Sequence, residues 1–207
     1  MKHRIKKTKK RLHELRKREN RYRLFIAPQA AALPPAAPHT TPHKRTVFIY
    51  EGEHRRLCLE TLHMGAYGLE TGGQFFGIET WNGALVITYV LGPGPNAKHS
   101  PAFFQQDIQY LKQEADRLMY LGSLRQIGEW HSHHHLGLSV PSGRDSNSMK
   151  TAIRMHKEMS RYLLCIAVCD DRFASATPFM YNLDGYETWA WDIIPGESPV
   201  RKMLENV

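Results

Sequence analysis

Cysteines and long apolar runs are both scarce in this chain of 207 residues. No stretch approaches the roughly 18 consecutive apolar residues of a membrane-spanning helix, so we expect no transmembrane segment. Three cysteines, Cys58, Cys165 and Cys169, are present without a CxxC pair, which argues against a disulfide framework and a cysteine zinc finger. We therefore expect buried thiols, a reducing compartment and a cytoplasmic location.

An excess of basic charge is lacking outside one end of the chain. The formal net charge is +8. Residues 1–23 carry twelve Lys/Arg against two acidic residues, a net charge of +10, whereas the remaining 184 carry sixteen Lys/Arg against eighteen Asp/Glu, a net charge of −2. The folded part is thus expected to be nearly neutral. The basic arm is either simply solvated or the place where nucleic acid or another acidic partner binds.

Composition divides the chain into three parts. Residues 1–26 form the basic N-terminal arm, and its short apolar run at 24–27 is too brief for a secretory signal. Residues 27–43 contain five prolines and six alanines, so they cannot hold a helix or a central strand and are interpreted as a linker. We expect the folded domain to span residues 44–207.

Within 44–207 the hydrophobic period switches between two and 3.6, which is typical of an α/β or α+β domain. The pattern predicts strands at 46–50, 72–79, 84–90, 125–133, 162–170 and 176–182. It predicts helices at 53–63, at 142–160, and from Ser100 and Pro101 along an apolar face that runs from Phe104 to Leu118.

Two histidines, His131 and His133, are separated by one residue on a predicted strand. Residues two apart project from the same face, so both imidazoles can reach one metal ion. Ser142 and Asp145 occupy the first turn of the next helix at i and i+3, where both side chains point the same way. Three ligands of the His, His, Asp type leave one tetrahedral position for water, which is the pattern of catalytic zinc.

Water at such an ion needs a general base, and Glu70 is our candidate, because it precedes a glycine-containing strand. These residues together resemble the JAMM (MPN-plus, or JAB) metalloproteases, whose pattern is a Glu in an E-x-x-G-like strand, then H-[ST]-H, then S-x-x-D. The matching residues are Glu70 with Gly73, His131-Ser132-His133, and Ser142-Gly143-Arg144-Asp145.

The resemblance covers roughly residues 46–182 and implies an MPN/JAB1, cytidine-deaminase-like domain with a mixed curved sheet flanked by helices. It implies one Zn²⁺ per chain with His131, His133 and Asp145 as ligands. Glu70 is implied as the acid/base, and Ser142 as the donor to the oxyanion. The motifs are most similar to prokaryotic JAB proteins encoded with bacterial ubiquitin-like conjugation enzymes.

The spacing departs from the family pattern. Eight residues, His134 to Pro141, separate the second histidine from the serine, whereas the usual number is seven, and His134 replaces the usual proline. Either the loop carries a one-residue insertion or the ligand pair is His133 and His135, which also share a strand face. Glu129, just upstream, is expected to alternate away from the face of His131, and the isolated His99 to be a surface or capping residue.

The expected function is that of a zinc isopeptidase or peptidase. The resemblance implies cleavage after the C-terminal glycine of a ubiquitin-like protein by a zinc-activated water, in deconjugation, precursor processing or both. Cognate conjugation enzymes are possible further partners. Alternatives are a hydrolase that trims a sulfur-carrier protein, a RadC-like protein linked to DNA metabolism, and a non-catalytic scaffold, against which the complete ligand set argues.

Overall fold

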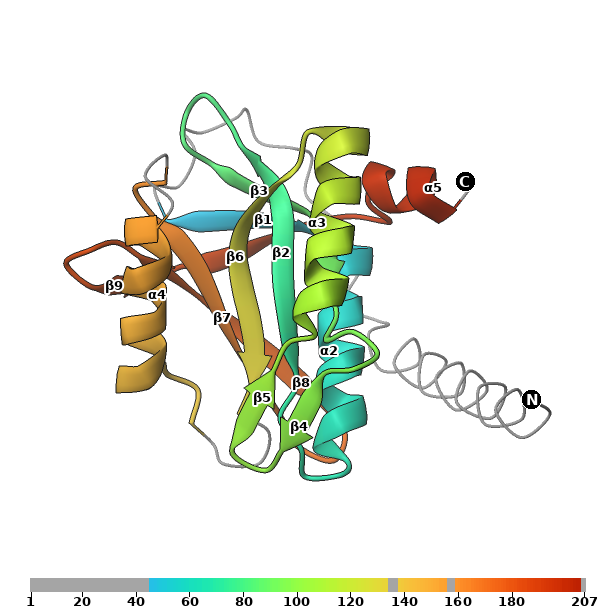
Figure 1. Cartoon of the computed structure of the whole chain (residues 1–207), viewed down its shortest axis with the longest axis vertical. Helices are drawn as coiled ribbons and strands as arrows, with labels where there is room; N and C mark the ends of the chain where they lie inside the picture. The colour runs from blue at the N-terminus through green and yellow to red at the C-terminus, as the bar shows by residue number, and fades with distance from the viewer. Residues whose placement is uncertain (1–44, 134–137, 156–158, 206–207) are drawn as a thin grey trace, which may run out of the picture. The chain divides into compact units, whose positions relative to one another are not determined.

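The computed structural model describes residues 45–205 except for two short stretches, 134–137 and 156–158 (Figure 1). The predicted arm and linker, and the residues His134 and His135, lie outside the described residues. The domain boundaries predicted above stay predictions.

Strands and helices alternate along the described chain, as the switching periodicity predicts. The strands are β1 (Thr46–Tyr50), β2 (Gly72–Glu79), β3 (Leu85–Leu91), β4 (Lys98–Ser100), β5 (Phe103–Gln105), β6 (Arg125–Ser132), β7 (Tyr162–Cys169), β8 (Ala174–Tyr181), β9 (Tyr186–Thr188) and β10 (Ala190–Ile194). The helices are α2 (Glu51–Gly65), α3 (Ile108–Gly122), α4 (Gly143–Met155) and α5 (Pro199–Glu205).

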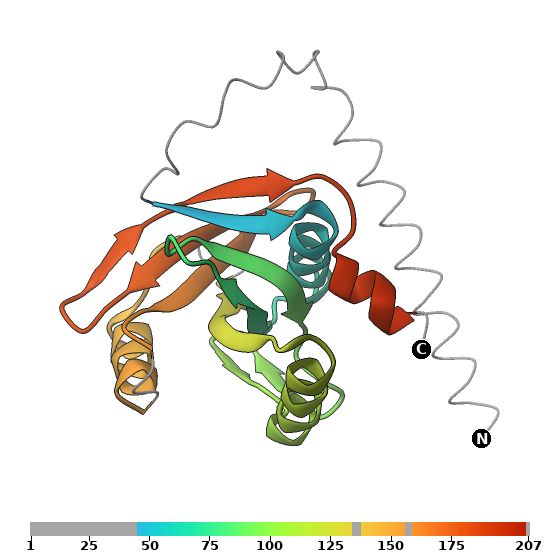
Figure 2. The same ribbon diagram turned by 90° about the horizontal axis from the view of Figure 1, so that it is seen from above.

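Eight strands form one mixed sheet in the order β10-β1-β3-β2-β6-β7-β8-β9. The sheet curves until its two ends approach each other. The backbone N–H of Trp189 donates to the carbonyl of Pro178 at 2.9 Å, and the indole Nε1 of Trp191 donates to the carbonyl of Ala176 at 2.7 Å. Helix α2 contacts β1, β3 and β10 as well as β7 and β8, so it lies within the curve of the nearly closed sheet (Figure 2).

The other helices bury their apolar residues against separate parts of the sheet. Met149 and Ile153 of α4 belong to a cluster with side chains of β7 and β8, whereas Leu118 of α3 and Leu204 of α5 belong to a cluster on β2 and β3. Strands β2 and β7 flank β6 in the sheet, so α3 and α4 pack on either side of β6 (Figure 1). The α+β class and the helix-flanked, curved mixed sheet predicted from the sequence are confirmed.

One predicted helix begins at the wrong residue. The helix was expected to start at Ser100, but residues 98–105 form the hairpin β4–β5. Helix α3 begins only at Ile108. The N-cap is Asp107, whose carboxylate accepts the backbone N–H of Tyr110 at 3.1 Å. The helical spacing of Phe104 and Ile108 is therefore a coincidence across a boundary, and Asp107, a preferred N-cap residue, is the signal that marks it.

The described helices include none with the length and apolarity that a bilayer crossing requires. All three cysteines are buried, as expected. Burial raises the pKa of the Cys165 thiol well above its ordinary value, so this thiol stays protonated and unreactive at neutral pH.

Candidate metal centre

His131 lies on strand β6 and His133 directly after it, and these are the two histidines predicted to bind a metal ion. The Nε2 atoms of His131 and His133 lie 3.0 Å apart. The Nδ1 of His133 is 2.6 Å from the carbonyl oxygen of Leu138, and because that oxygen only accepts, Nδ1 carries the proton. The proton on Nδ1 leaves the lone pair of Nε2 directed at His131, which is the tautomer that a metal ligand needs.

The first turn of α4 brings the third donor. One oxygen of Asp145, Oδ1, lies 3.5 Å from Nε2 of His131. The other, Oδ2, accepts the backbone N–H of Ser142 at 2.7 Å, and the backbone N–H of Asp145 donates to Oγ of Ser142 at 3.2 Å. This reciprocal pair is a capping box that starts α4 and fixes the Asp145 carboxylate at the same time.

The donor set fits a tetrahedral zinc ion. Atoms of His131, His133 and Asp145 lie within 4.8 Å of one another, one ligand atom from each residue. Ligands at about 2.0–2.1 Å from zinc in tetrahedral geometry are separated by about 3.4 Å, close to the two separations given above. Burial is the main cause that lowers the pKa of His131 to about 4; the Asp145 carboxylate opposes this and His133 adds to it. His131 is thus neutral at pH 7, the form that ligates metals.

Glu70 lies just before β2 rather than on it, and its backbone is held from two directions. Its N–H donates to the carbonyl of Ser100 at 2.9 Å, and Nδ1 of His99 lies 2.8 Å from its carbonyl oxygen. The next residue, Thr71, is tied to β6: its N–H donates to Oγ of Ser132 at 2.9 Å, and the N–H of Ser132 donates to its carbonyl at 2.8 Å. The central serine of the His-Ser-His run therefore anchors the segment that carries Glu70.

The prediction that His99 is an isolated surface or capping residue is wrong. It belongs to β4, and its ring contacts the Glu70 backbone and packs against Phe104, with ring centroids 5.5 Å apart. Nothing local in the sequence marks this role, because the contact spans 29 residues and depends on the β4–β5 hairpin folding over the site.

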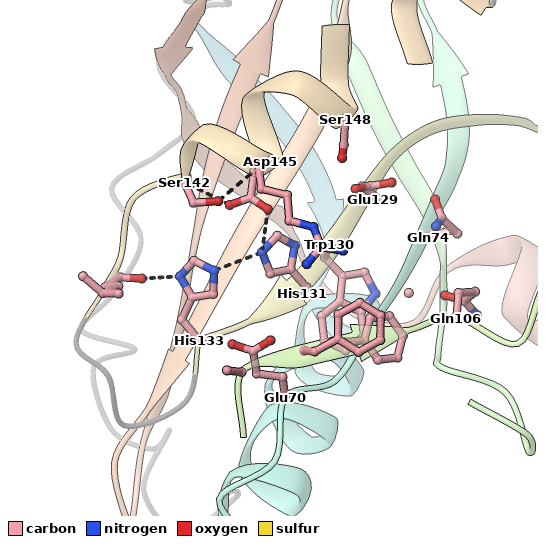
Figure 3. Close-up of a pocket in the computed structure, with 16 residues that line it drawn as sticks. Glu70, Gln74, Gln106, Glu129, Trp130, His131, His133, Ser142, Asp145 and Ser148 are labelled. Atoms are coloured by element: carbon pink, nitrogen blue, oxygen red, sulfur yellow. Dashed lines mark hydrogen bonds and ion pairs between the residues drawn. The ribbon is translucent and has the colours of Figure 1, made fainter. Parts of the chain in front are cut away.

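Glu70, the three donor residues and Ser142 line one cavity of about 430 Å³ (Figure 3). The Glu70 carboxylate points toward His131 and His133 from the side opposite Asp145. The structure thus brings all five residues of the predicted site together. The register that pairs His131 with His133 is the one in which the described residues form a donor cluster, while His135 lies outside them.

Glu129 also lines this cavity, contrary to the expectation that it alternates away from His131. Residues two apart on a strand share a face, so Glu129 and His131 point the same way along β6. Burial, and next the Asp145 carboxylate, raise the pKa of Glu129 to about 7, against the effect of a hydrogen bond from Gln74. The sequence position alone was sufficient to place Glu129 at the site.

Gly72, the first residue of β2, permits close packing beside the cavity. A Cβ atom on Gly72 would lie 2.5 Å from the carbonyl oxygen of Trp130 and 2.6 Å from the ring of Phe104. A side chain at this position would therefore push β2 or the hairpin away from β6. Since Gly72 pairs with His131 in the sheet, its lack of a side chain keeps Glu70 near the histidines.

The chain is similar to a curated protein in sequence and to a solved structure in fold. No known family model matches the chain. Over 106 residues it is 31% identical to a protein of Sinorhizobium fredii (strain NBRC 101917 / NGR234) named "Probable metalloprotease y4qB". The match covers 50% of this chain and 64% of that relative, so the chain spans less than two thirds of the relative's length.

A solved structure shares the fold. The solution structure of protein DSY2949 from Desulfitobacterium hafniense superposes with a TM-score of 0.54 at 16% sequence identity. The superposition covers 73% of this chain and 94% of the other. This likeness concerns the fold alone.

Proposed function

We propose that this protein is a zinc-dependent peptidase of the JAMM/MPN-plus type that cleaves after the C-terminal glycine of a ubiquitin-like protein. The observation that carries the proposal is the convergence of two imidazoles, one carboxylate and a separate glutamate in a single cavity. The relative named as a probable metalloprotease supports a peptidase, and the H-[ST]-H and S-x-x-D residues support the JAMM type.

The proposed roles follow from where each group lies. When bound by His131, His133 and Asp145, a Zn²⁺ ion supplies Lewis-acid polarisation of the scissile carbonyl and lowers the pKa of the attacking water. Glu70 accepts a proton from that water and returns it to the leaving amine, so one carboxylate serves both half-reactions.

Ser142 is suited to stabilise the developing oxyanion. Its Oγ accepts the Asp145 N–H, so the hydroxyl proton remains to be donated to a substrate oxygen. A preorganised donor of this kind acts mainly on the charge that grows in the transition state.

The substrate assignment is tested with a folded ubiquitin-like protein that ends in Gly-Gly and carries either a short C-terminal peptide extension or a lysine isopeptide. The zinc-loaded full-length chain is expected to release the extension after the last glycine, seen by mass spectrometry as a defined mass loss. Glu70→Gln protein and chelator-treated wild type are the controls. Cleavage of an unstructured Gly-Gly peptide without cleavage of the folded protein would contradict the ubiquitin-like substrate, and no cleavage of either would contradict a peptidase of this type.

A further inference from the structure

Hydrogen bonds hold the two peptide groups on either side of the Glu70 Cα atom. The group before Cα is held by the Glu70 N–H, which donates to the carbonyl of Ser100 on β4 at 2.9 Å. The group after Cα is held at both ends. Its carbonyl oxygen lies 2.8 Å from Nδ1 of His99, also on β4, and its N–H, which belongs to Thr71, donates to Oγ of Ser132 on β6 at 2.9 Å. Glu70 is therefore bound to both β4 and β6.

These bonds fix the direction of the Glu70 side chain. A peptide group is planar, so the orientations of the two groups that flank a Cα atom set its φ and ψ angles and hence the direction of its Cα–Cβ bond. With both groups held, the Glu70 carboxylate keeps only the rotations of its own side chain. It points toward His131 and His133 (Figure 3), so loss of one bond changes where the carboxylate lies relative to these metal donors.

His99 contributes its side chain to this arrangement from the β4–β5 hairpin. Because the Glu70 carbonyl oxygen only accepts, Nδ1 of His99 carries the proton and donates. The imidazole packs on Phe104 of β5, with ring centroids 5.5 Å apart, and Phe104 itself lines the metal cavity. His99 is not among the described residues that line that cavity, so any effect it has on a reaction there passes through Glu70.

We propose that His99 is a positioning residue of the proposed peptidase, which holds the Glu70 carboxylate at the metal centre through the peptide group that follows it. The inference rests on the proposed function, in which Glu70 transfers the proton, and adds a residue outside the motifs that resemble the JAMM family. The bond from Thr71 to Ser132 does not replace that of His99, because a planar group held at one end can still tilt about that contact. Such small displacements of a catalytic group slow the chemical step.

The test compares two replacements of His99 in the full-length, zinc-loaded protein. His99→Asn keeps a donor, because its amide nitrogen is bonded to Cγ as Nδ1 is in histidine. His99→Leu has a similar volume and no donor. On the folded Gly-Gly substrate, His99→Leu is expected to lower kcat about 10-fold at an unchanged KM, the size expected for one lost hydrogen bond, while His99→Asn stays within about 3-fold of wild type.

Hydrogen exchange gives a second readout that does not depend on cleavage. The Thr71 N–H belongs to the peptide group that His99 holds, so its exchange, followed by NMR, should be about 10-fold faster in His99→Leu than in wild type or His99→Asn. His54→Leu is the matched control and should equal wild type. The His54 ring also packs on an aromatic ring, that of Trp191 with centroids 6.0 Å apart, and His54 is not among the described residues that line the cavity.

Zinc content and thermal unfolding are recorded for each protein. A wild-type kcat or an unchanged Thr71 exchange rate in His99→Leu overturns the role of His99, as does an equal loss of kcat in His99→Leu and His99→Asn; the proposed function then stands. Loss of zinc from His99→Leu also overturns it, because His99 would then act on the metal donors rather than on Glu70. If the wild-type protein cleaves no substrate, the proposed function fails and this inference fails with it.

Discussion

Ser142 combines two tasks in one hydroxyl, because Oγ caps α4 and also faces the cavity. We expect Ser142→Ala to lower the cleavage rate about 10²- to 10³-fold through loss of the oxyanion donor. It should also destabilise the fold by about 1 kcal/mol through loss of the cap. Ser142→Gly separates the two effects, since glycine at an N-cap costs only a few tenths of a kcal/mol. Steady-state rates and thermal unfolding of both variants check this; a full rate with Ser142→Gly would exclude a catalytic role.

Glu70 is expected to act only on proton transfer, because its carboxylate is not one of the clustered metal donors. Glu70→Gln keeps the size of the side chain but cannot accept the proton of the attacking water. Cleavage should fall by about 10²- to 10⁴-fold, while zinc content and the melting temperature stay at wild-type values. Kinetics and metal analysis on the same preparation provide the measurement. Equal activity of wild type and variant would refute the mechanism.

Substitutions of the three proposed metal ligands are expected to act on zinc binding instead. His131→Ala, His133→Ala and Asp145→Ala each remove one of three closely spaced ligand atoms, so the dialysed proteins should lose most of their zinc. His135→Ala serves as the comparison, because the alternative register assigns the ligand to that residue. Elemental analysis of zinc per chain decides between the registers: retention by His131→Ala with loss by His135→Ala would reverse the assignment.

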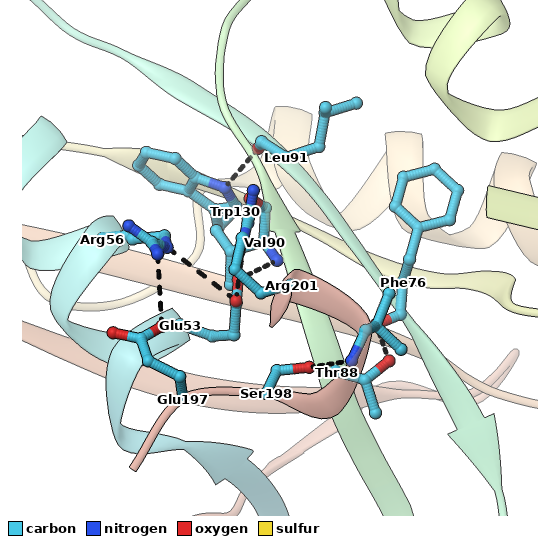
Figure 4. Close-up of polar contacts among 11 residues, drawn as sticks. Glu53, Arg56, Phe76, Thr88, Val90, Leu91, Trp130, Glu197, Ser198 and Arg201 are labelled. Carbon is cyan, nitrogen blue, oxygen red and sulfur yellow. Dashed lines mark hydrogen bonds and ion pairs between the residues drawn. The ribbon is translucent and has the colours of Figure 1, made fainter. Parts of the chain in front are cut away.

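Among the elements, the short helix α5 is docked by a buried ion pair (Figure 4). Glu53 of α2 is fully buried and accepts from Arg201 Nε at 3.0 Å and Nη2 at 2.8 Å, as well as from the backbone N–H of Val90 at 2.7 Å. Arg201 also donates to the Val90 carbonyl at 3.0 Å, and its guanidinium lies 3.6 Å from the ring centroid of Tyr89. One arginine thus joins α5, α2 and β3.

Arg201→Met keeps the aliphatic stem and leaves the buried Glu53 carboxylate without its main partner. The free energy of unfolding is expected to fall by about 3–5 kcal/mol, the usual cost of breaking a buried pair by removing one member. Lys202→Met, a change at the exposed neighbouring position, is the control. Urea denaturation of the full-length proteins measures both, and a loss below about 1 kcal/mol would show that the Glu53–Arg201 pair does not hold α5 in place.

At the scale of the whole molecule, the charge is divided between a strongly basic segment and a nearly neutral remainder, +10 on residues 1–23 and −2 on the rest. The predicted site, the contacts of His99 and Ser132 that hold the Glu70 segment, and both apolar clusters are made from described residues that lie after residue 44. Deleting residues 1–43 is therefore expected to leave zinc content, melting temperature and cleavage of a small substrate nearly unchanged.

The same deletion should weaken binding to an acidic partner. A labelled RNA oligonucleotide is a suitable probe, and its affinity for the full chain should fall steeply with salt, because released counterions and screening weaken exposed charge contacts. Fluorescence anisotropy at several salt concentrations measures the slope for both proteins. A truncated chain that unfolds or loses zinc would show instead that the basic arm is required by the domain.

The local sequence pattern was sufficient to predict the strands and helices with a clear period, and to predict that the side chains of His131, His133 and Asp145 lie together. Strand alternation places His131 and His133 on one face, and the i, i+3 spacing of Ser142 and Asp145 places both in one helical turn. The same rule, applied consistently, also places Glu129 beside His131. The sequence by itself therefore determined the site wherever its members are near neighbours along the chain.

Tertiary structure decided the rest. Glu70 approaches the histidines because Gly72 pairs with His131, a residue 59 positions away. The Glu70 backbone is bound by the β4–β5 hairpin, which the helical spacing of Phe104 and Ile108 had led us to predict as part of a helix. Strand pairing brings together residues that are far apart in the sequence, and its register is set by the packing of whole faces rather than by any local period. For that reason the hydrogen bonds of His99 and Ser132 to the Glu70 segment, and a groove beside Glu129, could be recognised only in the folded chain.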